Sequence, residues 1–248
     1  MPRLTALSQG LLRRVSGREI RRVDAPTRSF ATGMALLKSV ISPATVIDVG
    51  AADGTPDLYR HFSPASHRYL LVEPNPAFRP ALNRFSQQWN AVAVEACCGA
   101  AAGEQILNVF ADRKKASLFP VEADHPMTSR IEVAVETMDR LVARFRLVPP
   151  YLVKIDVEGA ELSVLAGAQR TLADTAAVVI ETMLLPRFPG APELGDIISH
   201  LMQAGFAVFD ILAGFNDPET GFLRQADLVF VKRDAEFRAR RRKGRTGH

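Results

Sequence analysis

The sequence is poor in cysteine, and its two cysteines, Cys97 and Cys98, are neighbours. Adjacent cysteines rarely form a disulfide with each other, because its geometry is hard to meet across one peptide bond. The chain also lacks a CxxC pair and any spacing typical of zinc ligands. We therefore expect two small buried thiols, and neither a disulfide framework nor a zinc site.

Long apolar runs are missing as well. The longest, residues 176–185, is interrupted by Glu181 and Thr182 and is far shorter than the ~20 residues that a membrane span needs. The arginines near the start are not followed by a continuous apolar stretch or a small-residue cleavage site, so we expect no secretory signal. A cytoplasmic protein is the expectation.

Basic residues are scarce in the middle of the chain, although the net charge is +4. Residues 1–30 carry seven Arg against two acids, residues 232–248 carry eight Lys or Arg against two acids, and residues 31–231 hold 16 basic and 23 acidic residues. With one Trp and three Tyr, the acidic middle does not suggest a nucleic-acid groove, and no nucleic-acid partner is expected. The basic tail is expected to be a solvated arm that can contact anionic surfaces.

Apolar runs of strand length alternate with amphipathic segments of helix length, which predicts a doubly wound α/β sheet, mostly parallel. Two final strands, joined by a turn-rich loop, predict an antiparallel hairpin at the sheet edge. We expect a basic N-terminal helical extension over 1–30, one domain over 31–233 and a disordered tail over 234–248. The expected strands are 45–49, 68–72, 91–96, 151–155, 177–180, 206–211 and 227–231, with two less regular ones at 105–110 and 131–135. The expected helices are 34–39, 56–61, 76–87, 137–146, 158–172 and 192–204.

The first expected strand, 45–49, contains Asp48 and leads into the loop Gly50-Ala51-Ala52-Asp53-Gly54. Its glycines allow a tight turn and close approach of a ligand to the backbone. A pyrophosphate loop favours bare amide donors and positive charge, so two aspartates disfavour a nicotinamide dinucleotide and favour a cationic ligand such as S-adenosylmethionine. Glu73, which follows the next strand, has the spacing of an acid that accepts hydrogen bonds from ribose hydroxyls.

A second group of acids follows the strand 151–155. Lys154 and Asp156 lie on one face of that strand, and Glu158 follows at the start of the expected helix. Close carboxylates can raise one another's pKa and provide a base near neutral pH, or they can hold a hard divalent cation. A metal is not implied by the pattern; its ligands would be Asp156 and Glu181, which ends the next strand. We expect Glu161 to complement the helix dipole or to lie on an exposed face.

Together these segments resemble the FkbM family of S-adenosylmethionine-dependent methyltransferases, over about residues 45–231. The resemblance rests on VIDVGAADG, LLVEPNP, VETMDRL, LVKIDVEGAELSVLAGA, VVIET and DLVFVKR, of which KIDVEGAE is the most family-specific. The family commonly has Asn where this chain has Ala52. The resemblance implies a class I, Rossmann-like methyltransferase sheet and methyl transfer to a hydroxyl of a sugar, a glycan or a natural product.

By the same resemblance, the cofactor would be bound by Asp48, Gly50, Ala51, Asp53, Gly54 and Glu73. Lys154, Asp156 and Glu158 would line the acceptor site, with Asp156 as the expected proton acceptor. The acceptor loops are expected at 112–130, 184–194 and 214–225. A nucleic-acid methyltransferase and a non-catalytic cofactor-binding module remain as alternatives. The oligomeric state is left open by the sequence.

Overall fold

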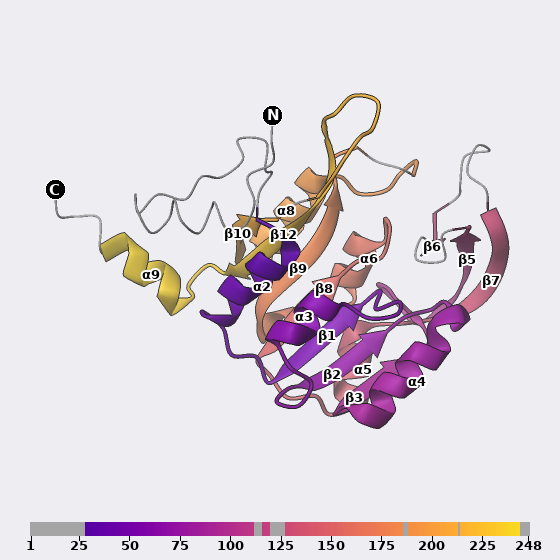
Figure 1. Ribbon diagram of the computed structural model, residues 1–248, viewed down its shortest axis with the longest axis horizontal. Helices are drawn as coiled ribbons and strands as arrows, with labels where there is room; N and C mark the ends of the chain where they lie inside the picture. Colours follow the sequence, from indigo (N-terminus) through magenta and orange to yellow (C-terminus); the bar gives the residue numbers. More distant parts are fainter. Residues whose placement is uncertain (1–27, 112–115, 120–126, 186–187, 213, 244–248) are drawn as a thin grey trace, which may run out of the picture.

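The computed structural model describes residues 28–111, 116–119, 127–185, 188–212 and 214–243. Its main sheet has the strand order β3-β2-β1-β8-β9-β12-β10, and the short β11 pairs with β12 (Figure 1). The strands are β1 (Thr45–Val49), β2 (Arg68–Val72), β3 (Ala91–Val94), β8 (Tyr151–Ile155), β9 (Thr175–Met183), β10 (Phe206–Ile211), β11 (Phe215–Asn216) and β12 (Leu223–Lys232).

The centre of this sheet is parallel and one edge is antiparallel. β1 pairs in parallel with β2 and β8, and further parallel pairs join β2 to β3 and β8 to β9. β12 runs antiparallel to both β9 and β10, which confirms the expected hairpin and inserts its second strand inside the sheet. This is the mostly parallel α/β sheet of the class I methyltransferase fold that the sequence predicts.

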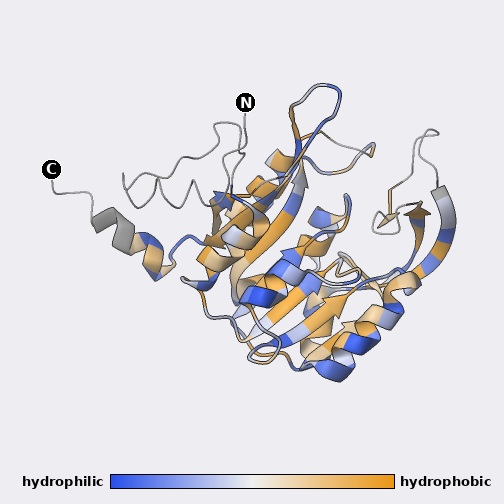
Figure 2. Cartoon of the chain, in the orientation of Figure 1, coloured by the Kyte–Doolittle hydropathy of each residue, from blue (hydrophilic) through white to orange (hydrophobic). Residues whose placement is uncertain are grey.

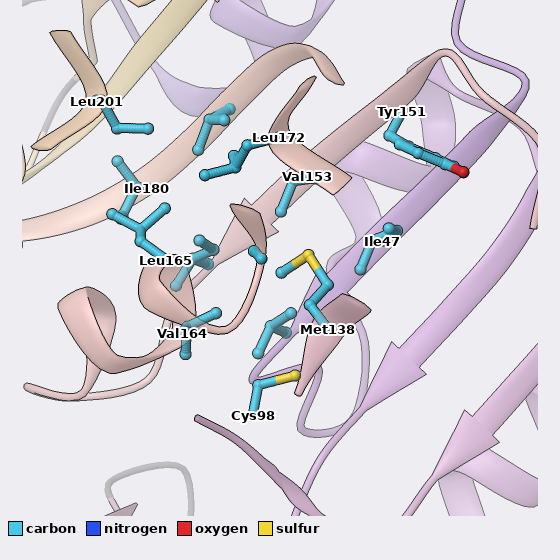
Figure 3. Packing of buried hydrophobic residues seen from close by; sticks show 14 of the residues in the cluster. Ile47, Cys98, Met138, Tyr151, Val153, Val164, Leu165, Leu172, Ile180 and Leu201 are labelled. Carbon is cyan, nitrogen blue, oxygen red and sulfur yellow. The ribbon is translucent and has the colours of Figure 1, made fainter. Parts of the chain in front are cut away.

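Helices cover both faces of the sheet, because its central strands are apolar on both sides (Figure 2). One face packs on residues of α5 (Met138–Arg144), α6 (Glu161–Ala166), α7 (Gln169–Ala173) and α8 (Leu194–Gln203). Figure 3 shows Val164 and Leu165 of α6 directed toward Val153 and Ile180 of this face. The other face packs on α2 (Phe30–Lys38), α3 (Pro56–His61), α4 (Arg79–Gln88) and Phe237 of α9 (Glu236–Lys243).

A second, smaller sheet lies beside the first, with the order β4-β7-β5-β6. Its strands are β4 (Cys97–Cys98), β5 (Gly103–Phe110), β6 (Ala116–Ser117) and β7 (Met127–Glu136). The long antiparallel pair β5–β7 extends the two less regular strands expected from the sequence. Both cysteines are buried and unbridged, as expected, and burial raises the pKa of each thiol to about 12.

Several helices start at side chains that satisfy free backbone N–H groups. Ser29 accepts a hydrogen bond from the backbone N–H of Thr32 at the start of α2, and Thr137 accepts one from Arg140 at the start of α5. Asn75 accepts a bond from Ala77 at the short 3₁₀ turn η1 (Pro76–Phe78), which precedes α4. The helix expected over 76–87 therefore begins with a tighter turn.

The expected helix 158–172 is divided in two. α6 ends before Gly167, and α7 begins at Gln169. A Cβ atom at Gly167 would lie 2.0 Å from the carbonyl oxygen of Gly99, so the chain needs glycine where it approaches the β4 end. This close approach, which depends on tertiary structure, interrupts a segment whose local sequence favours one helix.

The ends of the chain differ in part from expectation. The disordered tail expected over 234–248 contains helix α9, and Phe237 on this helix makes an edge-to-face contact with Phe209 of β10 at a centroid distance of 5.3 Å. An apolar anchor and good helix formers account for the difference. Residues 1–27, most of the expected N-terminal extension, and residues 244–248 lie outside the described residues. In the described part of the chain, no helix is long and apolar enough to cross a membrane.

Candidate functional site

A cavity of about 320 Å³ lies at the ends of the parallel strands, where α/β sheets bind ligands. Nine of the residues singled out from the sequence line it together: Gly50, Ala51, Asp53, Gly54, Glu73, Lys154, Asp156, Glu158 and Glu181. The glycine loop and the acidic segment are about a hundred residues apart in the sequence, and the fold joins them in one site. Asp48 is not among the residues that line the cavity.

The glycine loop packs directly on the end of β8. A Cβ atom at Gly50, where φ is +79°, would lie 1.8 Å from the carbonyl oxygen of Asp156, and the backbone N–H of Asp156 donates to the carbonyl of Val49 at 3.0 Å. Any side chain at Gly50 would therefore push the loop away from β8. Glycine is required here because the two halves of the site are in contact through their backbones.

Glu73 is buried beside this loop and is held by backbone donors. Its Oε2 accepts a hydrogen bond from the N–H of Ala52 at 2.9 Å, and its Oε1 accepts one from the N–H of Asn75 at 2.8 Å. Burial raises the pKa of Glu73 to about 7, although these bonds oppose the rise. Each carboxylate oxygen keeps a further lone pair, so Glu73 can still accept hydrogen bonds from a ligand in the cavity.

Ala52 adopts a backbone conformation that alanine disfavours. Its φ is +44°, in the left-handed region. The N–H of Ala52 donates to Glu73 in this conformation, so the turn and the carboxylate position each other. Asn tolerates the left-handed region better than Ala does, which gives a physical reason for the Asn that the FkbM-type loop commonly has at this position.

Asp48 lies behind the cavity wall and has structural partners. Its Oδ2 accepts hydrogen bonds from the hydroxyl of Tyr59 at 2.6 Å and from Oγ1 of Thr55 at 2.9 Å, while Oδ1 lies 3.5 Å from Nζ of Lys154. The side chain is fully buried. Asp48 thus connects β1 to α3 and β8. Through these contacts it holds the two ends of the glycine loop in place.

Lys154 carries its positive charge within the acidic site. Its ammonium nitrogen lies 3.1 Å from Oδ2 of Asp156 and 3.5 Å from Asp48. Burial by itself would lower the pKa of Lys154, but the attraction of Asp156 and Asp48 outweighs it and raises that pKa. Asp156 keeps 37% of its side-chain surface exposed, so one carboxylate of the pair is accessible to a ligand.

A strained turn follows Asp156. Glu158 has a φ of +49° and Gly159 a φ of +104°. The N–H of Gly159 donates to Oε1 of Glu161 at 2.9 Å, and the hydroxyl of Ser117 donates to the carbonyl of Glu158 at 2.8 Å. The exposed position considered for Glu161 is therefore wrong: it is buried, its carboxylate closes the turn, and burial raises its pKa to about 7.

The sequence analysis missed Asp227, which also lines the cavity. Asp227 on β12 is directly opposite Glu181 on β9, and Oε1 of Glu181 accepts a hydrogen bond from the side-chain amide of Gln225 at 2.8 Å. Burial, together with Asp156, raises the pKa of Asp227 to about 6 and that of Glu181 to about 9. Asp227 is the first residue of the expected strand 227–231. Because that strand is antiparallel, its first residue lies beside the last residues of the parallel strands. The expected hairpin could therefore have placed Asp227 at the cavity.

The small sheet closes the cavity with apolar side chains. Leu107 of β5, with Ala116 and Leu118 at β6, lines it, as do Phe30 and both cysteines. Among the described residues of the three expected acceptor loops, those that line the cavity, Ala116 and Leu118, belong to 112–130. Among the described residues, no group of three or more His, Cys, Asp or Glu side chains is arranged to hold a metal ion, so a metal at Asp156 and Glu181 has no support there.

The chain is similar to one protein family and to several solved structures. The model of the methyltransferase FkbM domain matches residues 48–208. No curated protein matches the chain. Similar solved structures include a precorrin-6y C5,15-methyltransferase from Geobacter metallireducens, with 15% identity and a TM-score of 0.41 over 81% of this chain and 86% of that one.

Two further similar structures are from Aeropyrum pernix and Pyrococcus horikoshii. Fibrillarin from Aeropyrum pernix, with S-adenosyl-L-methionine bound, has 16% identity and a TM-score of 0.42 over 80% of this chain and 73% of that one. A putative RNA methyltransferase from Pyrococcus horikoshii has 12% identity and a TM-score of 0.44 over 91% and 98%. The domain match covers more than half of the chain, including the glycine loop and the acidic turn, and the chain therefore belongs to the FkbM family of S-adenosylmethionine-dependent methyltransferases.

Proposed function

We propose that the protein transfers a methyl group from S-adenosylmethionine to a hydroxyl oxygen of a sugar, a glycan or a natural product. The observation that carries the proposal is the single cavity in which the glycine loop and Glu73 face the carboxylates of Asp156 and Glu158. A cofactor end and a proton-accepting end share one cavity, as a transfer to a hydroxyl group requires.

The residues of the first end fit the cofactor. The cavity volume lies within the range of small-molecule sites, and the loop between Gly50 and Gly54 presents backbone atoms to it. Glu73 keeps acceptor capacity for ribose hydroxyls. When bound, the cofactor supplies a methyl group activated by a positively charged sulfur. Gly50, Ala51, Asp53, Gly54 and Glu73 are proposed to contact it, and Asp48 to support the loop.

At the second end, Asp156 is proposed to accept the proton of the acceptor hydroxyl. The ion pair with Lys154 orients its carboxylate, and the accessible part of the side chain faces the cavity. Glu158 is proposed to hydrogen-bond the acceptor. Among the described residues, Lys154 is the one basic side chain of the lining, which favours a neutral or cationic acceptor over a phosphate backbone.

The first test is calorimetric titration of the wild type and of Glu73→Ala with S-adenosylmethionine and S-adenosylhomocysteine. We expect binding to the wild type and a loss of at least about tenfold in the variant, since two or more hydrogen bonds to a charged group are removed. Absence of binding to the folded wild type would overturn the proposal.

The second test addresses transfer. Wild type and Asp156→Ala are compared for transfer of a labelled methyl group to a panel of hydroxyl-bearing sugars and natural products. We expect Asp156→Ala to keep its cofactor affinity and to lose turnover by about 10²-fold or more, the usual contribution of a positioned base. Glu104→Gln, on the exposed part of β5, serves as a matched control. Unchanged turnover in Asp156→Ala would remove Asp156 from the mechanism.

A further inference from the structure

One carboxylate at the acidic end of the cavity, which Asp156, Glu158, Glu181 and Asp227 form, is held in a backbone conformation that its residue type disfavours. Glu158 has a φ of +49° and is followed by Gly159 at +104°. A non-glycine residue stays in the left-handed region only where the surrounding structure fixes it there, and such residues cluster at functional sites. The contacts that fix this turn therefore decide where the Glu158 side chain lies.

Two hydrogen bonds hold the turn. The N–H of Gly159 donates to Oε1 of Glu161 at 2.9 Å, so this bond is local. The hydroxyl of Ser117 donates to the carbonyl oxygen of Glu158 at 2.8 Å, and Ser117 belongs to β6 of the small sheet. The second bond thus joins the turn to a segment that precedes it by 41 residues and that lies outside the main sheet.

The direction of the Ser117 hydroxyl is fixed by its own partners. Ser117 is fully buried, and its Oγ accepts a hydrogen bond from the N–H of Phe119 at 3.1 Å. On β5, the buried side-chain amide of Asn108 donates to the carbonyl oxygens of Phe119 at 2.8 Å and of Ser117 at 3.3 Å. These polar groups satisfy one another, and together they hold β6 against the turn at Glu158.

Apolar contacts also attach β6 to the turn. The ring of Phe119 lies so close that a Cβ atom at Gly159 would be 3.1 Å from it, and the same ring stacks on that of Phe188 with a centroid distance of 6.4 Å. A buried hydroxyl, unlike an apolar side chain, has a desolvation cost that only hydrogen bonds offset. Beyond packing, Ser117 therefore contributes its hydrogen bonds, and the one that it donates goes to Glu158.

We infer that Ser117, held by Asn108, is a positioning residue that directs the carboxylate of Glu158 toward the acceptor. The inference rests on the proposed function, because it takes Glu158 as a hydrogen-bond partner of the acceptor. Without the Ser117 bond, Glu158 can relax to a negative φ, which turns its side chain in a different direction. The neighbours of Ser117, Ala116 and Leu118, line the cavity, so one short segment both lines the cavity and holds the turn.

The experiment measures methyl transfer by the full chain as wild type, Ser117→Ala, Glu158→Ala and the double variant. The acceptor is the member of the sugar and natural-product panel that the wild type methylates. We expect Ser117→Ala to raise the KM for this acceptor about fivefold and to change kcat by less than about twofold, because a binding contact is displaced. Glu158→Ala should raise the KM about tenfold. Adding Ser117→Ala to Glu158→Ala should then cause no further rise, because Ser117 acts through Glu158.

Thr175→Val is the matched control for loss of a buried hydroxyl. The hydroxyl of Thr175 also donates to a backbone carbonyl, that of Thr171, at 2.8 Å, but Thr175 lies at the start of β9, away from the cavity. This variant should lower stability to urea as Ser117→Ala does and leave the acceptor KM unchanged. Asn108→Ala should raise that KM about threefold, and it tests the inference independently of whether Ser117→Ala folds.

Calorimetric titration with S-adenosylmethionine separates the acceptor effect from a general loss of structure, since every variant should keep the wild-type cofactor affinity within about twofold. Three results would overturn the inference and leave the proposed function standing: an unchanged acceptor KM in Ser117→Ala, an unchanged KM in Glu158→Ala, or a rise in the double variant equal to the product of the two single rises. A wild type that binds the cofactor and methylates no member of the panel would overturn both.

Discussion

The ammonium nitrogen of Lys154 lies 3.5 Å from Oδ1 of Asp48, its neighbour in register across the β1–β8 pair. Both residues are buried, and the same ammonium reaches Asp156 at 3.1 Å. Lys154 therefore connects a carboxylate that supports the glycine loop with a carboxylate that faces the cavity. Since neither Asp48 nor Lys154 is exposed to water, each depends on the other to offset its charge.

Replacing Lys154 by Met should destabilise the protein by about 3 kcal/mol, because it leaves Asp48 buried without a cation. Urea unfolding followed by circular dichroism measures the change. The double variant Lys154→Met with Asp48→Asn should recover part of the loss, since a neutral amide needs no cation and can still accept bonds from Tyr59 and Thr55. A loss below about 1 kcal/mol, the size expected for an exposed pair, would contradict the buried role.

Asp139 offers a second test, in the VETMDRL segment. From the first turn of α5 its carboxylate accepts hydrogen bonds from the N–H groups of Arg170 and Thr171 and from the hydroxyl of Thr171. Partial burial would raise the pKa of Asp139, but these donors hold it below its usual value. Asp139→Asn should lower stability by about 1 kcal/mol at neutral pH, because it removes the negative charge and one of the two acceptor oxygens that take up these hydrogen bonds.

The pH dependence of that effect follows from the direction of the shift. A carboxyl whose pKa is lower in the folded protein stabilises it above the pKa of the unfolded chain, near 4. This stability is lost as the pH falls through the folded value. The unfolding free energies of wild type and Asp139→Asn should therefore converge between about pH 4 and pH 2. A difference that stayed constant over that range would show that the charge of Asp139 is not involved.

The left-handed conformation of Ala52 predicts a stabilising substitution. Asn tolerates a φ of +44° better than Ala does, so Ala52→Asn should raise the free energy of unfolding by about 0.5 kcal/mol. The neighbouring Ala51 is 1% exposed, and Ala51→Asn should destabilise the protein because it buries an amide. Thermal unfolding of both variants compares the two positions, and a destabilised Ala52→Asn would refute the conformational explanation.

Ligand-free protein should become less stable as the pH rises from about 5 to about 8.5. Burial raises the pKa of Glu73, Glu161, Asp227 and Glu181 above the usual carboxyl values. The unfolded chain then holds fewer protons than the folded one over this range, so the unfolding free energy falls with pH. Urea midpoints across the range measure the fall, and Glu181→Gln should reduce it. Stability that increased with pH would contradict the burial of these groups in neutral form.

Hydrophobic patterning predicted the strands well where they are buried on both faces. β1, β2 and β8 begin and end at the expected residues, because a short apolar run bounded by turn residues is a local property. The same pattern placed Glu73, Asp156 and Glu158 at one sheet edge, where the structure has them. The boundary between α6 and α7 could not be predicted, since it depends on Gly99, a distant residue.

Side-chain direction was the weaker part of the prediction. Asp48 was expected at the cofactor, yet it points to the same face as Val46, where Tyr59 of α3 meets it. Asp227 was overlooked although the antiparallel hairpin was expected, because the beginning of an antiparallel strand was not compared with the ends of the parallel strands that it meets. For both aspartates the sequence shows a carboxylate near a strand end. It does not show which residue of another element lies beside it, Tyr59 of α3 for Asp48 and Glu181 of β9 for Asp227.

The position of β12 has a consequence for the order in which the protein folds. β12 follows β9 and β10 along the chain but is inserted between them. Until it arrives, β9 presents an open edge and β10 has no neighbour in the sheet. Such non-local pairing slows folding, because the loop entropy is lost before the contacts form. Since β12 also brings Asp227, the acidic end of the cavity is completed only when this insertion closes the sheet, and a chain arrested earlier has unpaired strand edges exposed to aggregation.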